Sequence, residues 1–151
     1  MNPSANCIAL IKRFEGFSAK PYLCPSGVQT IGFGSTRYVD GSYVHLNDIE
    51  IDEKQATAIM LTTLKSYASD VSRYVKVKIN QNQFDALVDF AYNCGSKNLL
   101  NSTLLRKINE GNFVGAAFEF GKWVRGNNIV LQGLVNRRYA EKQLFETPVQ
   151  V

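Results

Sequence analysis

The stretch from Phe14 to Ser35, FEGFSAKPYLCPSGVQTIGFGS, constrains the fold more than any other part of this sequence. Upstream of it, apolar residues recur near helical spacing, Ser4 is a suitable N-cap, and Gly16 stands where a helix should end. Downstream of Gly16, β-forming residues alternate with glycine, which is typical of a strand. We therefore expect a short N-terminal helix followed at once by a β-structure.

The chain from Lys20 to about Leu46 predicts a small antiparallel sheet. VQTIGFGS and RYVDGSYVHL supply the β-forming residues, and the pair Asp40-Gly41 is a strong hairpin-turn signal. Asp52, with Gln55 at the third helical position, then resembles a capping box, so a long helix is expected from there to about residue 73.

The remainder of the sequence predicts helices. Asn80 and Gln83 form a second capping-box pattern before FDALVDFAYNCG, which has one apolar stripe and a stop at Gly95. Three further helices are expected near residues 102–110, 112–124 and 131–146. This order predicts an α+β fold in a single domain, 1–151. The domain would have a β-rich lobe (about 16–51), a connecting helix (about 52–73) and a helical lobe (about 74–151 with the N-terminal helix), and a ligand cleft between the lobes.

Composition narrows the class of protein. A chain of 151 residues that is 45% hydrophobic and 20% charged is typical of one soluble globular domain. Its net charge of +4 favours an anionic partner, but the dispersed Lys and Arg residues do not resemble a nucleic-acid footprint. The cysteines Cys7, Cys24 and Cys94 match no zinc or redox motif and predict reduced thiols. We find no signal peptide and no membrane span of about 20 residues.

Glu15 is the candidate for acid chemistry. It falls in the last turn of the first helix, where unpaired carbonyls and the helix dipole disfavour a carboxylate. Phe14 and Phe17 would add desolvation, and both effects raise the pKa of the carboxyl group. A carboxyl that keeps its proton near neutral pH can serve as a general acid. For an isolated glutamate, however, a solvated helix end is the ordinary interpretation.

The residues around Glu15 carry more information than Glu15 itself. Eight residues separate Glu15 from Cys24, and five separate Cys24 from Thr30. This pattern resembles the catalytic signature of the phage endolysin lysozymes, a glycoside hydrolase family. NQNQFDALVDFAYNCG, NSTLLRKINEG, AAFEFGKW and GLVNRRYAEKQLF are similar to successive blocks of that family, in the same order. The resemblance covers nearly the whole chain and implies a two-lobed lysozyme-like fold.

The resemblance implies an endolysin that hydrolyses the β-1,4 bond between N-acetylmuramic acid and N-acetylglucosamine in peptidoglycan and so lyses the host cell. Glu15 would protonate the departing oxygen, and Thr30 would help to hold a water molecule. Cys24 replaces the more familiar carboxylate. Its thiolate could act as a base or as a nucleophile, whereas its thiol could only orient water. The family is regarded as inverting, but the distance between the catalytic groups decides the outcome.

Four further residues are predicted to bind substrate. Tyr92 and Asn93 match family positions that line the sugar cleft, although a core tyrosine and a helix-end asparagine are equally ordinary interpretations. Strict strand alternation groups Gly32 with Thr30, which would leave room for a sugar beside the hydroxyl. Arg137 matches a family arginine near the catalytic glutamate, where it would lower the carboxyl pKa.

Three more residues bear on how far the resemblance extends. Trp123 is expected in the core rather than as a platform for sugar stacking. Ser35 stands where the family commonly has histidine, and His45 is expected at the surface.

Three alternative functions would each need a feature of their own. A cysteine peptidase would need a histidine base, and the chain has only His45. A zinc amidase would need histidine ligands that are lacking, so we expect no metal or cofactor. A catalytically inactive wall-binding module is the main alternative. The endolysin interpretation implies a monomer that binds peptidoglycan and no nucleic acid, has no stable membrane association, and waits in the host cytoplasm until a holin permeabilises the membrane.

Overall fold

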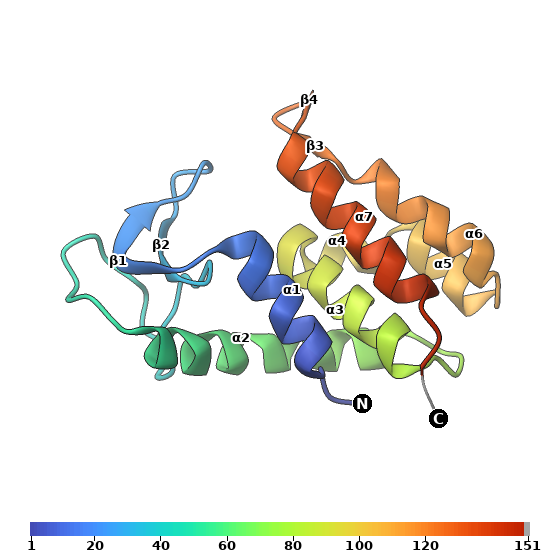
Figure 1. Cartoon of the computed structure of the whole chain (residues 1–151), viewed down its shortest axis with the longest axis horizontal. Coiled ribbons are helices and arrows are strands. Elements are labelled where there is room, and N and C mark those ends of the chain that lie inside the picture. Colours follow the sequence, from blue (N-terminus) through green and yellow to red (C-terminus); the bar gives the residue numbers. More distant parts are fainter. Residues whose placement is uncertain (150–151) are drawn as a thin grey trace. The chain divides into compact units, whose positions relative to one another are not determined.

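The computed structural model describes residues 1–149 (Figure 1). Its elements, in chain order, are α1 (Ala5–Glu15), β1 (Ser18–Leu23), β2 (Gln29–Gly32), α2 (Glu53–Tyr74), α3 (Gln81–Cys94), α4 (Ser96–Leu100), α5 (Thr103–Asn109), α6 (Phe113–Glu119), the 3-10 helix η1 (Phe120–Lys122), β3 (Arg125–Gly126), β4 (Ile129–Val130) and α7 (Gln132–Glu146). Helices and small antiparallel sheets together make an α+β fold, as the sequence predicted.

The chain divides into two units, which we describe separately. The sheet unit comprises residues 11–66, and the helical unit comprises residues 1–10 with the described residues from 67 onward. The division falls inside α1 and α2, so each of these helices contributes residues to both units. None of the described helices combines the length and the apolar character that crossing a membrane requires.

α1 begins and ends where the sequence predicted. Ser4 precedes the helix, and its Oγ accepts a hydrogen bond from the backbone N–H of Asn6 at 3.3 Å, while its own N–H donates to Asp85 at 3.0 Å. The helix ends at Glu15 because Gly16 adopts a left-handed conformation with φ of 69°, which a glycine tolerates without strain. The chain can therefore turn directly from the helix into β1.

In the sheet unit, β1 pairs with β2 in antiparallel register, with Tyr22 opposite Thr30. Of the two β-forming segments that the sequence predicted, VQTIGFGS contains β2, whereas RYVDGSYVHL forms no strand. The second segment forms only one bridge, between Arg37 and Tyr43, around the expected turn at Asp40. β1 was missed because it contains Pro21, which lacks a backbone donor and is tolerated only at a sheet edge.

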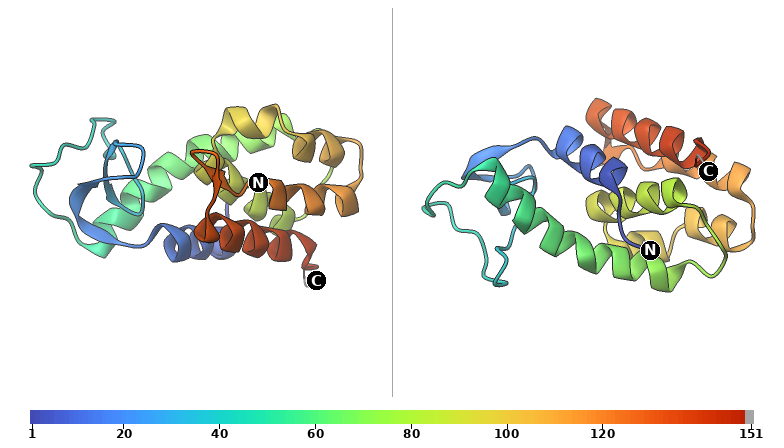
Figure 2. Two further views of the ribbon diagram at one scale, coloured as in Figure 1. Left: turned by 90° about the horizontal axis from the view of Figure 1, so that it is seen from above. Right: turned by 60° about the horizontal axis from the view of Figure 1, so that its bottom comes forward.

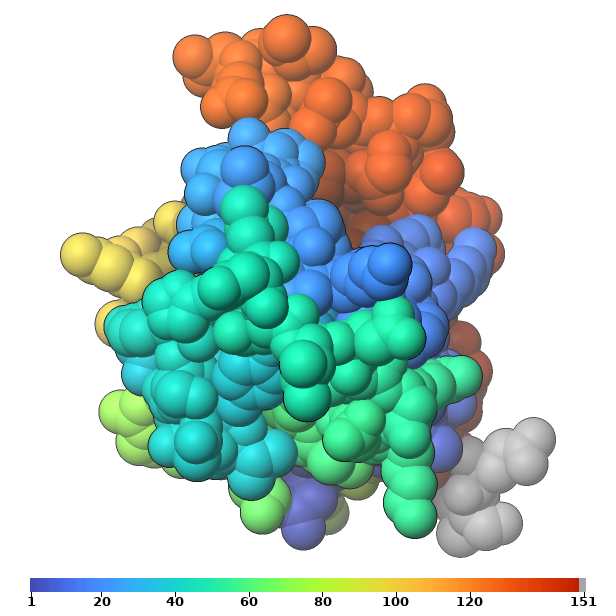
Figure 3. Space-filling model, turned by 90° about the vertical axis from the view of Figure 1, so that its left-hand side faces the viewer, coloured from blue at the N-terminus to red at the C-terminus, as the bar shows by residue number. Residues whose placement is uncertain are grey.

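The loop between β2 and α2 forms much of the surface of the sheet unit seen in Figure 3, in cyan to green. It ends at the capping box predicted for α2. Asp52 Oδ1 accepts from the Gln55 N–H at 2.7 Å, and the Asp52 N–H donates to Gln55 Oε1 at 2.9 Å. The helix then runs for 22 residues.

In the helical unit, α3 is the most deeply buried helix and packs against α7 (Figure 2). The predicted capping box is present, with Asn80 accepting from the Gln83 N–H at 2.8 Å. The predicted apolar stripe forms the core, where Phe90 meets Phe120 edge-on at a ring-centroid distance of 5.9 Å.

Two elements of the helical unit differ from the sequence predictions. The short helix α4 was not expected. The helix predicted over 112–124 ends earlier, at Glu119, and continues only as η1. The hairpin β3–β4 follows, because Asn127 and Asn128 adopt left-handed conformations with φ of 51° and 64°. Asparagine tolerates these angles better than most residues, and a two-residue turn of this kind closes a hairpin.

Candidate active site

Glu15 is the last residue of α1, and its side chain is half-buried in the sheet unit. The carboxylate lies directly against Gly34, in the turn that follows β2. A Cβ atom added at Gly34 would overlap the Glu15 carboxylate, and Gly34 has a φ of 76°. Both the left-handed backbone and the close approach require glycine here. The glycine-rich strand end therefore makes room for the candidate acid.

Cys24 lies in a tight turn directly after β1. The turn is closed by a hydrogen bond from the Gly27 N–H to the Cys24 carbonyl at 2.8 Å, and Ser26 Oγ lies 2.9 Å from Cys24 Sγ. The Ser26 hydroxyl is the largest influence on the thiol, followed by the Val28 backbone, and together they lower the pKa of Cys24 to about 7. A neighbouring hydroxyl, rather than a cation, provides the largest part of this effect. The thiolate is accessible near neutral pH.

Thr30 lies on β2 and is buried, with only 3% of its surface exposed. Its Oγ1 donates to the Val28 carbonyl at 2.8 Å. The hydroxyl has one hydrogen, so in this arrangement it can only accept from a further partner, such as a water molecule. Thr30 also makes the smallest contribution to the lowered Cys24 pKa, which fits a hydrogen already donated to Val28.

Gly32 does not border the free space that the sequence analysis expected. A Cβ atom at Gly32 would lie 3.0 Å from Ala56 Cβ and 3.6 Å from Ile51 Cδ1. The residue is a glycine because α2 packs closely on the strand at this point, and its φ of 65° also suits glycine. The expectation that Gly32 leaves room for a sugar is therefore wrong on packing grounds.

Tyr22 links the three predicted catalytic residues, and sequence reasoning missed it. It pairs with Thr30 across the sheet. Burial raises the pKa of Tyr22 most, and the negative charges of Glu15 and Cys24 raise it further. Both charged groups are therefore close enough to influence one phenol. The available signal was the position of Tyr22 two residues before Cys24, which gives the two the same side of an extended chain.

Three further residues of the sheet unit follow the sequence predictions to different degrees. Phe17 packs on Phe33 at a ring-centroid distance of 5.7 Å but remains 45% exposed, so it desolvates its surroundings less than expected. Ser35 is buried, and its hydroxyl makes no hydrogen bond within the described chain. His45 is exposed, as predicted.

Two of the residues predicted to bind substrate lie at the end of α3 in the helical unit. Tyr92 is half-buried, and its ring lies 5.5 Å from that of Tyr67. Asn93 lines a pocket of about 330 Å³ together with Trp123 and Arg125. Trp123 packs edge-on against Phe90 at 5.4 Å, as expected of a core residue, yet it also borders this pocket.

Arg137 is buried on α7 and holds Asp89 of α3 in a two-point ion pair. Its Nε donates to Asp89 Oδ2 at 3.0 Å and its Nη2 donates to Oδ1 at 2.9 Å. Burial acts most strongly on the pKa of Asp89 and raises it, but hydrogen bonds from Glu141 and Arg137 and the charges of the arginines outweigh it, so the pKa is lowered. The pattern of the sequence did not reveal this partner.

A second buried pair lies beside the first. Arg138 Nη2 donates to Glu141 Oε2 at 2.9 Å, and Arg138 also hydrogen-bonds Cys94. Burial raises the pKa of Cys94 to about 11, and it raises the pKa of the fully buried Cys7 further still. Cys7 is fully buried in the core, whereas Cys94 is half-buried and takes part in an ionic cluster. Among residues 1–149, no group of His, Cys, Asp and Glu could hold a metal ion.

Comparison with known proteins supports the fold described above. The phage lysozyme family model matches residues 12–141. An endolysin of Acyrthosiphon pisum secondary endosymbiont phage 1 is 37% identical, over 97% of this chain and 99% of the relative. The structure of an endolysin from Escherichia coli O157:H7 phage FAHEc1 has a TM-score of 0.90 at 33% identity, covering 97% of this chain and 94% of that one. The muramidase domain of SpmX from Asticaccaulis excentricus has a TM-score of 0.84 at 33% identity, covering 96% and 97%. The chain therefore belongs to the phage lysozyme family of glycoside hydrolases.

Proposed function

We propose that this phage endolysin cleaves the β-1,4 bond between N-acetylmuramic acid and N-acetylglucosamine, with Glu15 as the general acid. One observation carries the assignment of residues. Tyr22 pairs with Thr30, and its pKa responds to the charges of both Glu15 and Cys24. The three residues of the sequence signature thus gather around one side chain within a single unit.

In the proposed reaction, the Glu15 carboxyl donates its proton to the departing glycosidic oxygen. Thr30, whose hydrogen is donated to Val28, offers its oxygen lone pairs to the attacking water. Cys24, with a pKa of about 7, is roughly half thiolate at neutral pH. The thiolate takes a proton from that water or attacks the sugar carbon itself. Asn93, beside the pocket of the helical unit, supplies an amide suited to an acetamido group.

The decisive experiment replaces Glu15 with glutamine and measures the reducing ends released from purified peptidoglycan sacculi. An amide keeps the shape of the side chain but has no proton to give, so we expect activity to fall by about 100-fold or more. Unchanged activity would overturn the assignment. If the native chain itself released nothing while still binding sacculi, a wall-binding module would replace the enzyme.

The anomeric configuration of the first product separates the two roles of Cys24. Direct attack by water inverts the configuration at the sugar carbon, whereas a covalent sugar–sulfur intermediate retains it. A non-reducing anhydro-sugar would instead identify a transglycosylase. Replacing Cys24 with aspartate restores the more familiar carboxylate. We expect the variant to keep activity and to extend it to lower pH, since a carboxylate ionises well below pH 7.

We also propose that the chain works as a monomer and depends on a separate holin to reach the wall. Expression in cells without a holin should leave the cells intact, and prompt spontaneous lysis would contradict this dependence. Sedimentation of the purified protein should give the monomer mass of 16.9 kDa.

A further inference from the structure

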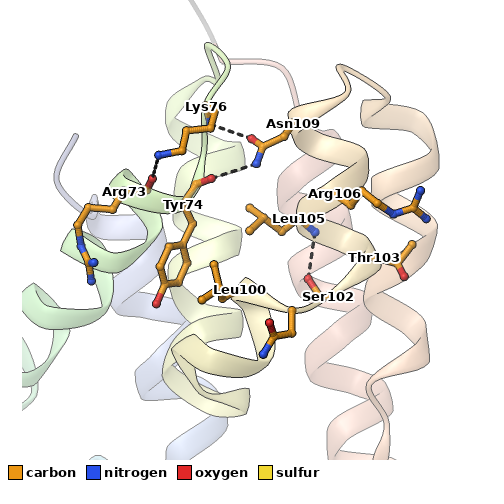
Figure 4. A pocket seen from close by; sticks show the side chains of 10 residues that line it. Arg73, Tyr74, Lys76, Leu100, Ser102, Thr103, Leu105, Arg106 and Asn109 are labelled. Carbon is orange, nitrogen blue, oxygen red and sulfur yellow. Dashed lines mark hydrogen bonds between the residues drawn. The ribbon is translucent and has the colours of Figure 1, made fainter.

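A second pocket lies in the helical unit, and we name it the α4–α5 pocket (Figure 4). It has a volume of about 520 Å³ and is lined by the end of α2, the corner between α4 and α5, and α5 itself. This volume is typical of sites that bind small molecules or sugar units. None of the residues predicted for the active site lines it.

Hydrogen bonds hold the walls of the α4–α5 pocket in place. Asn109 joins the segment after α2 to α5, because its Oδ1 accepts from the Lys76 N–H at 2.8 Å and its Nδ2 donates to the Tyr74 carbonyl at 3.0 Å. Ser102 caps α5 by accepting from the Leu105 N–H at 3.0 Å. Figure 4 shows these three hydrogen bonds as dashed lines. The pocket is therefore formed before any ligand arrives.

The lining of the α4–α5 pocket combines an apolar surface with polar side chains that are available to bond a ligand. The ring of Tyr74 lies beside Leu100, which is 47% exposed (Figure 4). The Asn101 amide and the Thr103 hydroxyl line the same pocket and make no side-chain hydrogen bond within the described part of the chain. An aromatic ring suits the C–H face of a sugar, and an amide matches the donors and acceptors of an acetamido group.

The charge at the α4–α5 pocket favours one acidic group. Arg73 pairs with Asp70, and Arg106 pairs with Glu110 at 3.3 Å and points away from the pocket in Figure 4. The Lys76 ammonium donates to the Arg73 carbonyl at 2.6 Å, and no carboxylate pairs with it among the described residues. Lys76 is exposed and thus supplies an unbalanced positive charge.

We propose that the α4–α5 pocket binds an acidic, N-acetylated glycan and serves as a second attachment point for the peptidoglycan strand. The choice of this polymer rests on the proposed function. One sugar ring lies on Tyr74 and Leu100, Asn101 and Thr103 hydrogen-bond its substituents, and Lys76 pairs with a carboxylate of the attached peptide. A second attachment to a long insoluble polymer raises overall affinity without a new catalytic contact.

The test measures co-sedimentation with purified sacculi in a Glu15→Gln background, so that the polymer stays intact. We expect Tyr74→Ala and Lys76→Gln each to weaken binding by about tenfold, through loss of the second attachment. Tyr139→Ala and Lys97→Gln are the matched controls, since both residues are exposed and line no pocket described here. With Glu15 intact, the two pocket variants should cleave a short soluble oligosaccharide at the native rate.

Each outcome decides the proposal. Equal binding by parent and pocket variants would overturn it, and so would an equal loss in Lys97→Gln, which would indicate general charge attraction. Pocket-dependent binding to lipopolysaccharide or teichoic acid but not to sacculi would overturn the choice of polymer. Lys76 is exposed, so Lys76→Gln remains decisive if Tyr74→Ala fails to fold. If the native chain released no reducing ends, the proposed function would fail, whatever the pocket variants bound.

Discussion

The properties of Cys24 depend on the turn that follows β1. The Gly27 N–H closes that turn, and Ser26 Oγ lies 2.9 Å from the sulfur. A hydroxyl that donates to sulfur stabilises the thiolate without bringing a net charge into the site.

Replacing Ser26 with alanine tests this arrangement. The largest influence that lowers the Cys24 pKa is removed, so we expect that pKa to rise above about 7. The rate of thiol alkylation against pH measures it, and Cys24 can be followed alone because burial raises the pKa of Cys94 to about 11 and that of Cys7 further. If the thiolate takes part in catalysis, activity at pH 7 falls with it. Ser66→Ala, at an exposed serine of α2, is the control, and an unchanged alkylation profile in Ser26→Ala would contradict the assignment.

Gly34 permits a second test at the level of single residues. Gly34→Ala should cost roughly 1–2 kcal/mol of unfolding free energy through its left-handed backbone, and Gly41→Ala should cost the same, with φ of 76° and 88° respectively. Only at Gly34 would the added methyl group overlap the Glu15 carboxylate. We expect kcat to fall by about 100-fold in Gly34→Ala alone, because a displaced Glu15 carboxyl would no longer be positioned to protonate the glycosidic oxygen. Equal kcat in the two variants would argue against a role for this contact.

At the level of elements, α3 and α7 carry two ion pairs in the core of the helical unit. Arg137 holds Asp89, and Arg138 holds Glu141. Burial raises the pKa of Glu141 well above its usual range, and the hydrogen bond and charge of Asp89 raise it further, against the effect of the arginines. Removing one partner from a buried pair leaves an uncompensated charge, which is strongly destabilising. Because Glu141 of α7 interacts with Asp89 of α3, ionisation of Glu141 makes the contact between the two helices sensitive to pH.

The raised pKa of Glu141 has a defined consequence for stability. An unfolded glutamate ionises near pH 4.3, before the folded one, so rising pH favours the unfolded chain. Glu141→Gln leaves Arg138 without its carboxylate, so we expect a lower unfolding free energy than that of the parent at pH 5. The variant lacks the loss that ionisation causes in the parent, so this deficit should narrow between about pH 5 and pH 8. Asp89 acts oppositely: its lowered pKa gives stability that is lost only as pH falls through the folded pKa, below its ordinary value of 3.8. Its contribution is therefore constant in this window.

Urea unfolding at several pH values measures the effect of Glu141→Gln. Glu146→Gln is the control, because Glu146 is an exposed glutamate on the same helix that pairs with Lys142 at 3.1 Å. The control should parallel the parent at every pH. Parallel curves for Glu141→Gln as well would show that Glu141 ionises alike in the folded and unfolded chains.

At the level of the whole molecule, the net charge of +4 governs the approach to an anionic wall. Attraction between exposed charges is screened beyond a Debye length of about 8 Å at physiological salt. We expect adsorption to sacculi to weaken steadily as salt is raised, while hydrolysis of a short neutral oligosaccharide changes little. Adsorption that does not respond to salt would show that specific contacts, rather than net charge, bring the protein to the wall.

The elements of the chain that follow from local signals were predictable. Gly16 ends α1 by its backbone conformation, and Asp52 and Asn80 begin α2 and α3 through side chains that bond a backbone group three residues away. β1 was not predictable in this way, because Pro21 disfavours a strand locally and only pairing with β2 stabilises it. The same holds for α4, whose five residues are too few to show a period.

The sequence by itself determined the family, the order of most elements, and the spacing of Glu15, Cys24 and Thr30. Each of these features depends on residues that are neighbours in the chain or recur at a fixed interval. Only the tertiary structure decided that Glu15 lies against Gly34, that Gly32 faces Ala56, and that Arg137 holds Asp89. These contacts join residues 19 to 48 positions apart (34 − 15 and 137 − 89). No local preference specifies such a pair, since its partners meet only when the elements that carry them pack.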